Sequence, residues 1–315
     1  MLSKDVKKEG DMSKRNNTIV LTGATGFLGS HLLYGLIQTG SYRVVVLKRS
    51  FSDMSRIKNV AGMTAVEFID VDVGVNAIRA RFAQGDVAAV IHCATEYGRG
   101  EKKIADVLQA NLIFPIKLLE MCVEFEVCAF INTDSYVNKP SFQYPYLLDY
   151  SLSKKSLLLW LPYFSQKIGI ANMILEHVFG PNDGEKKFVT GMVNQIAVEK
   201  KPAIELTPGD QVRDFIYVYD VVSAYLRVLE CLLAVSEPGL SEYEVGTGTG
   251  VDIKSFVEYI RVLSHSPTKL LFGALPYRRA EIMRSVANTN SLKSIGWATK
   301  YDWVSGLRDL LQHNE

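Results

Sequence analysis

The feature that most constrains the fold of this chain is a glycine-rich turn close to its N-terminus. A short apolar run at residues 19–21 leads into three glycines, Gly23, Gly26 and Gly29. Apolar residues then recur at helical spacing, and a second apolar run follows at residues 44–47. This order of strand, glycine turn, helix and strand predicts the opening βαβ unit of a dinucleotide-binding fold.

The predicted turn has the chemistry that a pyrophosphate requires. One glycine permits the sharp turn, one lets the backbone approach the phosphates, and one lets helix and strand pack closely. The N-terminus of the following helix adds free N–H groups and a positive dipole end. A glycine triplet alone is a weak signal, so the flanking strand and helix carry the prediction. The dinucleotide is expected to contact Gly23, Thr25, Gly26, Phe27, Leu28 and Gly29.

The end of the second strand indicates which dinucleotide binds. NAD-selective sites usually carry an acidic residue there, which hydrogen-bonds the ribose 2′-OH. This chain has Lys48, Arg49 and Ser50 instead, and two cations suit the 2′-phosphate of NADP. Both cations could also be ordinary solvated charges at a strand end. The sequence therefore favours NADP(H), with NAD as the alternative.

Composition excludes several classes of protein. The chain has 315 residues, a formal net charge of +1 and no apolar run of transmembrane length, so neither nucleic acid nor membrane is an expected partner. Residues 1–17 lack the apolar centre of a signal peptide, which predicts a disordered tail with Met12 as an alternative start. The four cysteines form no C-x-x-C pair, so no metal site is expected, and a reducing cytoplasm fits.

Apolar runs alternate with helical patterns as far as residue 175. The alternation predicts an α/β fold, a Rossmann-type doubly wound parallel sheet with helices on both faces, followed by a smaller C-terminal substrate-binding lobe. Further strands are expected at 65–69, 87–92, 127–131 and 171–175, and helices at 75–82, 104–125 and 150–167. The sheet domain is expected to comprise 18–180 and about 212–248, and the lobe about 181–211 and 249–315.

Tyr150 and Lys154 form the candidate catalytic pair. They are four residues apart, so they would share one face of a helix. A free tyrosine has a pKa near ~10, which is too high for easy proton transfer at neutral pH, and a nearby ammonium lowers that pKa. Thr133, at the end of the preceding strand, would hydrogen-bond a substrate oxygen that gains charge. A Y-x-x-x-K pattern also occurs by chance, so its position after the glycine-rich unit carries the argument.

The order of these motifs resembles the extended short-chain dehydrogenase/reductase family, also called the NAD-dependent epimerase/dehydratase family, from about residue 18 to the C-terminus. Shared motifs are T-G-A-T-G-F-L-G-S-H at 22–31, H-C-A-T at 92–95, the Tyr150/Lys154 pair, G-P at 180–181 and V-R-D-F-I-Y-V at 212–218. The resemblance implies that Asp70 meets the adenine and that Asn111 supports the active site. The cofactor site that it implies also includes Val71, Cys93, Ala94, Thr95, Asn111, Tyr150 and Lys154. Family members often form homodimers through two helices that border the sheet.

For the substrate, the resemblance implies that Arg213 holds a nucleotide-sugar diphosphate with help from Arg278. Either arginine could instead form a surface ion pair, which contributes little to stability. Arg213 lies between Val212 and an apolar strand, and this position favours the ligand role.

A narrower likeness is to bacterial 4-ketoreductases of the CDP-abequose and CDP-paratose synthase type, which reduce the 4-keto group of a CDP-3,6-dideoxyhexulose with NADPH. Short motifs carry it: A-T-E-Y-G at 94–98, N-T-D-S at 132–135, L-E-H-V-F-G-P at 175–181 and E-I-M-R-S-V-A-N at 281–288. His177 replaces the family's usual asparagine, and it is either a substrate contact or a packed histidine. The substrate cleft is expected to include Glu96, Tyr97, Thr133, Glu176 and His177.

These observations predict an NADPH-dependent 4-ketoreductase of a nucleotide-activated deoxy sugar in surface polysaccharide biosynthesis. A nucleotide-sugar 4-epimerase with tightly bound NAD would use the same residues, whereas a non-catalytic NADP sensor would commonly lack the Tyr/Lys pair. A 4,6-dehydratase is disfavoured, because related dehydratases read T-D-E where this chain has Thr133-Asp134-Ser135. Asp134 is expected to bond the following turn, although Glu176 could substitute for the missing acid.

Overall fold

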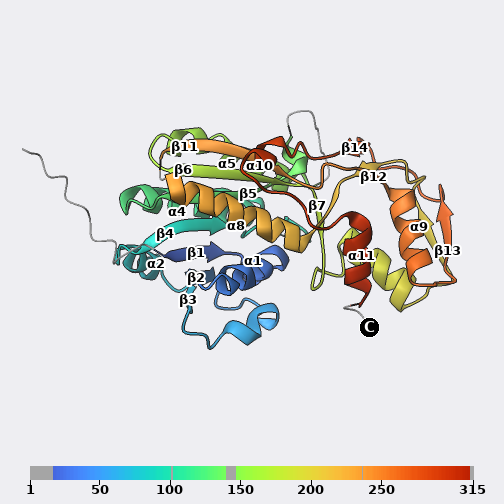
Figure 1. The fold of residues 1–315 in the computed structure, drawn as a ribbon, viewed down its shortest axis with the longest axis horizontal. Helices are drawn as coiled ribbons and strands as arrows, with labels where there is room; N and C mark the ends of the chain where they lie inside the picture. The colour runs from blue at the N-terminus through green and yellow to red at the C-terminus, as the bar shows by residue number, and fades with distance from the viewer. Residues whose placement is uncertain (1–16, 101, 140–146, 236, 313–315) are drawn as a thin grey trace, which may run out of the picture.

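The computed structural model describes residues 17–100, 102–139, 147–235 and 237–312. The predicted tail at 1–17 therefore lies outside the described residues, apart from Asn17. A parallel sheet forms the core of the described chain, with strand order β11-β6-β5-β4-β1-β2-β3 (Figure 1). Its strands are β1 (Thr18–Thr22), β2 (Arg43–Lys48), β3 (Val66–Asp70), β4 (Val87–His92), β5 (Ala129–Ser135), β6 (Gly169–Leu175) and β11 (Gly239–Val245).

Helices cover both faces of this sheet, because its central strands are apolar on both sides. Every residue of β1 and β4 is buried. One face carries α1 (Phe27–Gln38) and α8 (Val218–Val235). The other carries α2 (Val75–Phe82), α4 (Phe114–Glu124), α5 (Leu148–Leu158) and α6 (Leu161–Phe164). The layers confirm the predicted Rossmann-type α/β fold.

Most predicted elements are present with shifted bounds. The helix expected at 104–125 consists of α3 (Ile104–Leu108), a π-helical turn (Gln109–Ile113) and α4. The single helix expected at 150–167 is wrong, because the chain forms α5 and then α6, with Pro162 in the first turn of α6. A proline inside a helix removes a hydrogen bond and clashes with the preceding turn, so it starts a new helix here.

A smaller lobe is built mainly from the C-terminal half of the chain. The rings of Phe179, Phe215 and Phe256 pack together in its core. Its strand sets are β7 (His177–Phe179) with β10 (Phe215–Tyr217), β8 (Ala203–Leu206) with β13 (Lys269–Phe272), and β9 (Val212–Arg213) with β12 (Val251–Asp252) and β14 (Arg284–Ser285). Its helices include α7 (Phe188–Val193), α9 (Ile253–Leu263) and α11 (Trp303–Gln312). The chain crosses back after β10, since α8 and β11 belong to the large sheet and its layers.

Shorter elements complete the two parts. They are η1 (Ser55–Val60), η3 (Tyr136–Asn138), a second π-helical turn (Asn194–Val198) and α10 (Asn290–Ser294). None of the helices in the described ranges combines the length and apolar character needed to span a bilayer.

The carboxyl ends of the parallel strands open toward the smaller lobe. Ligands bind at this edge in open α/β sheets. A cleft of about 1660 Å³ lies there and is lined by residues of both parts. The topology therefore places the predicted strand-end residues around one cavity.

Candidate active site

The cleft brings together nearly all of the residues that the sequence predicts for the site. The predicted residues that line it are Gly23, Thr25, Gly26, Phe27, Leu28, Gly29, Lys48, Arg49, Val71, Cys93, Ala94, Thr95, Glu96, Tyr97, Thr133, Tyr150, Lys154, Glu176, His177, Arg213 and Arg278. Asp70 and Asn111 are not among the lining residues.

The glycine turn is shaped by backbone contacts that leave no room for side chains. Gly23 has a φ of +72°, and a Cβ there would lie 2.6 Å from the amide nitrogen of Ala94. A Cβ on Gly29 would lie 2.1 Å from the Gly23 carbonyl oxygen. These contacts hold α1 tightly against the turn and leave its N-terminus facing the cleft. Such a cradle fits the pyrophosphate of a dinucleotide.

The adenine contact predicted for Asp70 stays a prediction, and the structure shows which partner this carboxylate has in the protein itself. The Asp70 carboxylate forms an ion pair with Lys48 at 2.5 Å, because the two residues are register partners on β2 and β3. Val71 and Asp72 line the cleft in its place. Asp72 accepts hydrogen bonds from the backbone and side chain of Ser50, at 2.8 and 2.7 Å.

Asn111 is a buried brace rather than a direct cofactor contact. Its amide nitrogen donates to the Glu96 carbonyl at 2.7 Å and to the Ser153 hydroxyl at 2.9 Å. Its amide oxygen accepts from the Glu96 backbone N–H at 2.7 Å. The residue lies in the π-helical turn before α4, and π-bulges are frequent at functional sites. Asn111 thus ties the loop after β4 to α5, which carries the catalytic pair.

Tyr150 and Lys154 lie buried in α5 at the edge of the cleft. The Lys154 ammonium donates to the Thr133 carbonyl oxygen at 2.7 Å. Burial raises the pKa of Tyr150 well above its ordinary value, with further increases from Tyr97 and Asp134. Burial therefore dominates the pKa of Tyr150, and the lowering expected from the lysine does not set its direction. Burial also lowers the pKa of Lys154, which Asp134 partly opposes.

The Thr133 hydroxyl has protein partners on the α8 side of the sheet. It shares a 2.8 Å hydrogen bond with the Tyr225 hydroxyl and donates to the Cys93 sulfur at 3.2 Å. Ser135, two residues along β5, hydrogen-bonds Tyr150. Sequence reasoning treated Ser135 only as a missing acid. Strand alternation could not have revealed this contact, because it places Ser135 on the same face as Thr133, whose partner Tyr225 belongs to α8.

Tyr97 covers the candidate proton donor. Its ring stacks on the Tyr150 ring with centroids 4.9 Å apart. Lys187, just before α7, places its ammonium 4.4 Å from the centre of the Tyr97 ring and donates to the Tyr97 hydroxyl at 3.2 Å. Lys187 was missed by sequence reasoning because no motif marks it. Tyr97 and Lys187 therefore bridge the cleft next to the Tyr150 ring.

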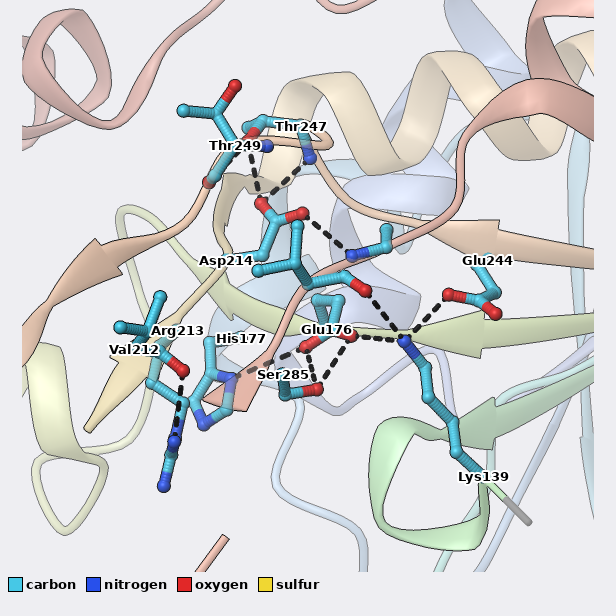
Figure 2. Close-up of polar contacts among 12 residues, drawn as sticks. Lys139, Glu176, His177, Val212, Arg213, Asp214, Glu244, Thr247, Thr249 and Ser285 are labelled. Atoms are coloured by element: carbon cyan, nitrogen blue, oxygen red, sulfur yellow. Dashed lines mark hydrogen bonds and ion pairs between the residues drawn. The ribbon is translucent and has the colours of Figure 1, made fainter. Parts of the chain in front are cut away.

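Glu176 belongs to a buried ionic cluster in which its carboxylate is paired with protein groups (Figure 2). Its side chain is 0% exposed, and its carboxylate pairs with Lys139 at 2.6 Å and accepts from the Ser285 hydroxyl at 2.8 Å. Lys139 also pairs with Glu244 at 2.6 Å. Burial alone would raise the pKa of Glu176, but the neighbouring His177 ring and the Lys139 ammonium lower it. Glu176 lines the cleft as predicted, whereas its contact with a substrate stays a prediction.

His177 combines the two roles that the sequence left open. Its ring packs between Tyr136 and Phe215, with centroid distances of 4.4 and 5.6 Å, and it also lines the cleft. Nδ1 lies 3.8 Å from the Glu176 carboxylate and has no hydrogen-bond partner among the described residues. Burial lowers the pKa of His177, which favours the neutral imidazole.

The two predicted phosphate-binding arginines lie on the lobe side of the cleft. Arg213 is buried and pairs with Glu281 at 2.7 Å. Arg278 is exposed and lines the same cavity. Asp214, next to Arg213, accepts from the backbone of Thr247, Gly248 and Ala287, so it anchors the loops that carry this wall (Figure 2).

The fold and the site together define a Rossmann-fold dinucleotide-binding enzyme with a glycine-rich turn and a Tyr/Lys pair in one cleft. The family model described as "NAD dependent epimerase/dehydratase family" matches residues 19–246. The chain belongs to this family, as its sequence motifs predict, and a nicotinamide dinucleotide is its expected cofactor.

Individual relatives agree with this assignment. A CDP-abequose synthase from Salmonella typhimurium is 35% identical over 298 residues, which cover 93% of this chain and 97% of that protein. A CDP-abequose synthase from Salmonella muenchen is 32% identical, with 95% and 99% covered. The solved UDP-glucuronic acid 4-epimerase from Bacillus cereus, in complex with UDP-glucuronic acid and NAD, has a TM-score of 0.80 at 21% identity, covering 94% of this chain and 98% of that chain.

Proposed function

We propose that the chain is an NADPH-dependent 4-ketoreductase of a nucleotide-activated deoxy sugar, with a CDP-linked sugar favoured. The supporting observation is the Tyr150/Lys154 pair in the same cleft as the glycine turn, in a chain 35% identical to a CDP-abequose synthase. The enzyme would act in the cytoplasm to supply surface polysaccharides such as O-antigen. Consumption of NADPH with a CDP-linked 4-keto sugar tests the proposal.

In this proposal, the residues of the chain supply binding, orientation and a proton. NADPH, when bound, would supply a hydride to the keto carbon. Burial keeps the Tyr150 hydroxyl protonated, so Tyr150 would donate its proton to the oxygen of the new alcohol. Thr133 and Ser135 would orient that oxygen. Lys154 would bind the cofactor ribose and so fix its position relative to Tyr150. Tyr97 would move aside to admit the sugar.

The positions of the nearby acids argue against a 4,6-dehydratase. The Asp134 carboxylate is buried and accepts from the Asn138 amide at 2.7 Å, so it bonds the following turn as predicted. Glu176, the other acid that the sequence left open, is paired with Lys139. Ser135 has no carboxylate to remove a proton at C5.

A nucleotide-sugar 4-epimerase with tightly bound NAD is the second candidate function. The Lys48–Asp70 pair favours it, because this pair neutralises one of the two cations expected at a 2′-phosphate. Co-purified NAD, with no consumption of added NADPH, would support the epimerase.

The Lys48–Asp70 ion pair leads to a specific prediction about the choice between NADPH and NADH. Because Lys48 is engaged by Asp70, Arg49 would carry most of the attraction for the 2′-phosphate. We expect Arg49→Glu to weaken NADPH binding by about tenfold to a hundredfold, the range for a charge-assisted hydrogen bond, and to spare NADH. Dissociation constants measured by fluorescence titration check this, with the exposed Arg43→Glu as control. Equal weakening of both cofactors would show that Arg49 does not read the phosphate.

We also propose that the chain forms a homodimer. Exposed apolar side chains occur on the neighbouring helices α3 and α5, namely Ile104, Leu108, Leu148 and Leu152. The resemblance to dimeric family members makes a second copy the expected occupant of this face. Sedimentation as a monomer at micromolar concentration would contradict the proposal.

A further inference from the structure

The lobe side of the cleft includes β8 and the chain that follows it. Glu205, Leu206, Thr207 and Gln211 all line the cavity there. β8 pairs with β13, which lies at the end of the molecule remote from the large sheet (Figure 1). A substrate with its sugar at Tyr150 and its diphosphate at the arginines would therefore place its base against β8.

Gln211 carries an unused hydrogen-bond acceptor in this region. The residue is 6% exposed, and its amide nitrogen donates to the Thr207 hydroxyl at 3.3 Å. Its amide oxygen is buried and has no partner within the described part of the chain. Leaving a buried acceptor unpaired is costly, so this oxygen indicates a ligand that brings an N–H or O–H donor.

Glu205 adds a second acceptor on the same side. The β8 residues on either side of it, Ile204 and Leu206, are buried, whereas Glu205 is exposed. Glu205 lines the same cavity as Thr207 and Gln211, and it is only two residues before Thr207 in the chain. An ionised carboxylate accepts hydrogen bonds and donates none. This end of the cleft is thus rich in acceptors.

We propose that Glu205 and Gln211 determine base specificity by binding the exocyclic amino group of cytosine. An amino group offers two N–H donors, which match two acceptors, and carboxylates commonly accept from the cytosine 4-amino group. Uracil and thymine present a carbonyl oxygen at the same position, which cannot donate a hydrogen bond to the carboxylate. The inference rests on the proposed function, since it identifies the nucleotide that this cleft takes.

The test measures binding of free nucleotides, so it does not depend on turnover. CDP, UDP, dTDP and ADP are titrated by calorimetry into the full-length protein with NADP⁺ present. We expect CDP to bind at least tenfold more tightly than the others. Glu205→Gln should weaken CDP by about tenfold or more and leave UDP within about twofold, because one charged acceptor is lost. Glu199→Gln, an exposed glutamate of the same lobe outside the cleft, should change neither.

Other results would overturn the proposal. Equal weakening of CDP and UDP by Glu205→Gln would show that the residue contacts a group common to all nucleotides, such as the ribose. Wild-type protein that binds UDP, dTDP or ADP as tightly as CDP would remove the cytosine assignment. CDP selectivity that depends on Glu205, without reduction of any keto sugar, would leave this inference standing and refute the proposed reaction. Reduction of keto sugars without base selectivity would support the proposed reaction and refute this inference.

Discussion

Tyr150→Phe is expected to retain NADP(H) binding and to lose about 10²–10⁴-fold in turnover, the usual contribution of general acid–base catalysis. The substitution removes only the hydroxyl that would protonate the new alcohol. The ring remains stacked under Tyr97, and Lys154 keeps its bond to the Thr133 carbonyl, so the fold and the cofactor cradle should be unchanged. Initial rates of NADPH oxidation and cofactor titrations measure the two effects separately.

The matched control for this variant is Tyr163→Phe. Tyr163 is 55% exposed and lies outside the cleft, so the loss of its hydroxyl should leave turnover within about twofold of wild type, as for most surface substitutions. Near-normal turnover in Tyr150→Phe would remove this tyrosine from the mechanism. Weak NADP(H) binding by the same variant would instead assign it a structural role.

Lys139→Met is expected to cost about 3–5 kcal/mol of unfolding free energy, because it leaves a buried carboxylate without its cation. The Glu176 side chain is 0% exposed, and that of Lys139 is 10% exposed. The Glu176 pKa is lowered from its ordinary value of 4.5, so the pair contributes stability above that pH and loses it as the pH falls through the folded-state pKa. Denaturant unfolding at pH 7 and at lower pH measures both effects.

Two further variants separate this pair from an ordinary surface interaction. Adding Glu176→Gln to Lys139→Met removes the unpaired charge and should recover part of the lost stability. Lys201→Met breaks an exposed pair with Glu199 and should cost no more than about 1 kcal/mol. If Lys139→Met lost as little unfolding free energy as Lys201→Met, the buried Lys139–Glu176 pair would not stabilise the fold.

The large sheet and its cleft could be predicted because their signals are local. Apolar runs mark the strands, and the three glycines mark the turn. Because the strands are parallel, their carboxyl ends fall on one edge of the sheet, and this holds without knowledge of the side-chain contacts. The register pair Lys48 and Asp70 could not be predicted, since it depends on how β2 and β3 align. The sequence therefore indicated the cofactor region and gave no sign that Asp70 also pairs with Lys48.

Other site features depend on partners that are distant in the sequence. The Thr133 hydroxyl meets Tyr225, 92 residues away, and Glu176 meets Lys139, 37 residues away. No motif links either pair. The raised pKa of Tyr150 also escaped prediction, because it reflects burial under Tyr97 more than the spacing of Tyr150 and Lys154.

The central claim is tested most directly by following NADPH absorbance while the purified protein is incubated with CDP-, GDP- and dTDP-linked 4-keto-deoxy sugars. The proposed function predicts that NADPH is consumed with the CDP-linked keto sugar and that one alcohol is formed for each NADPH oxidised. Nucleotide-linked hexoses without a keto group serve as the control compounds and should give no product. Formation of a 4-keto-6-deoxy sugar from those hexoses, with no NADPH consumed on any keto sugar, would contradict the account.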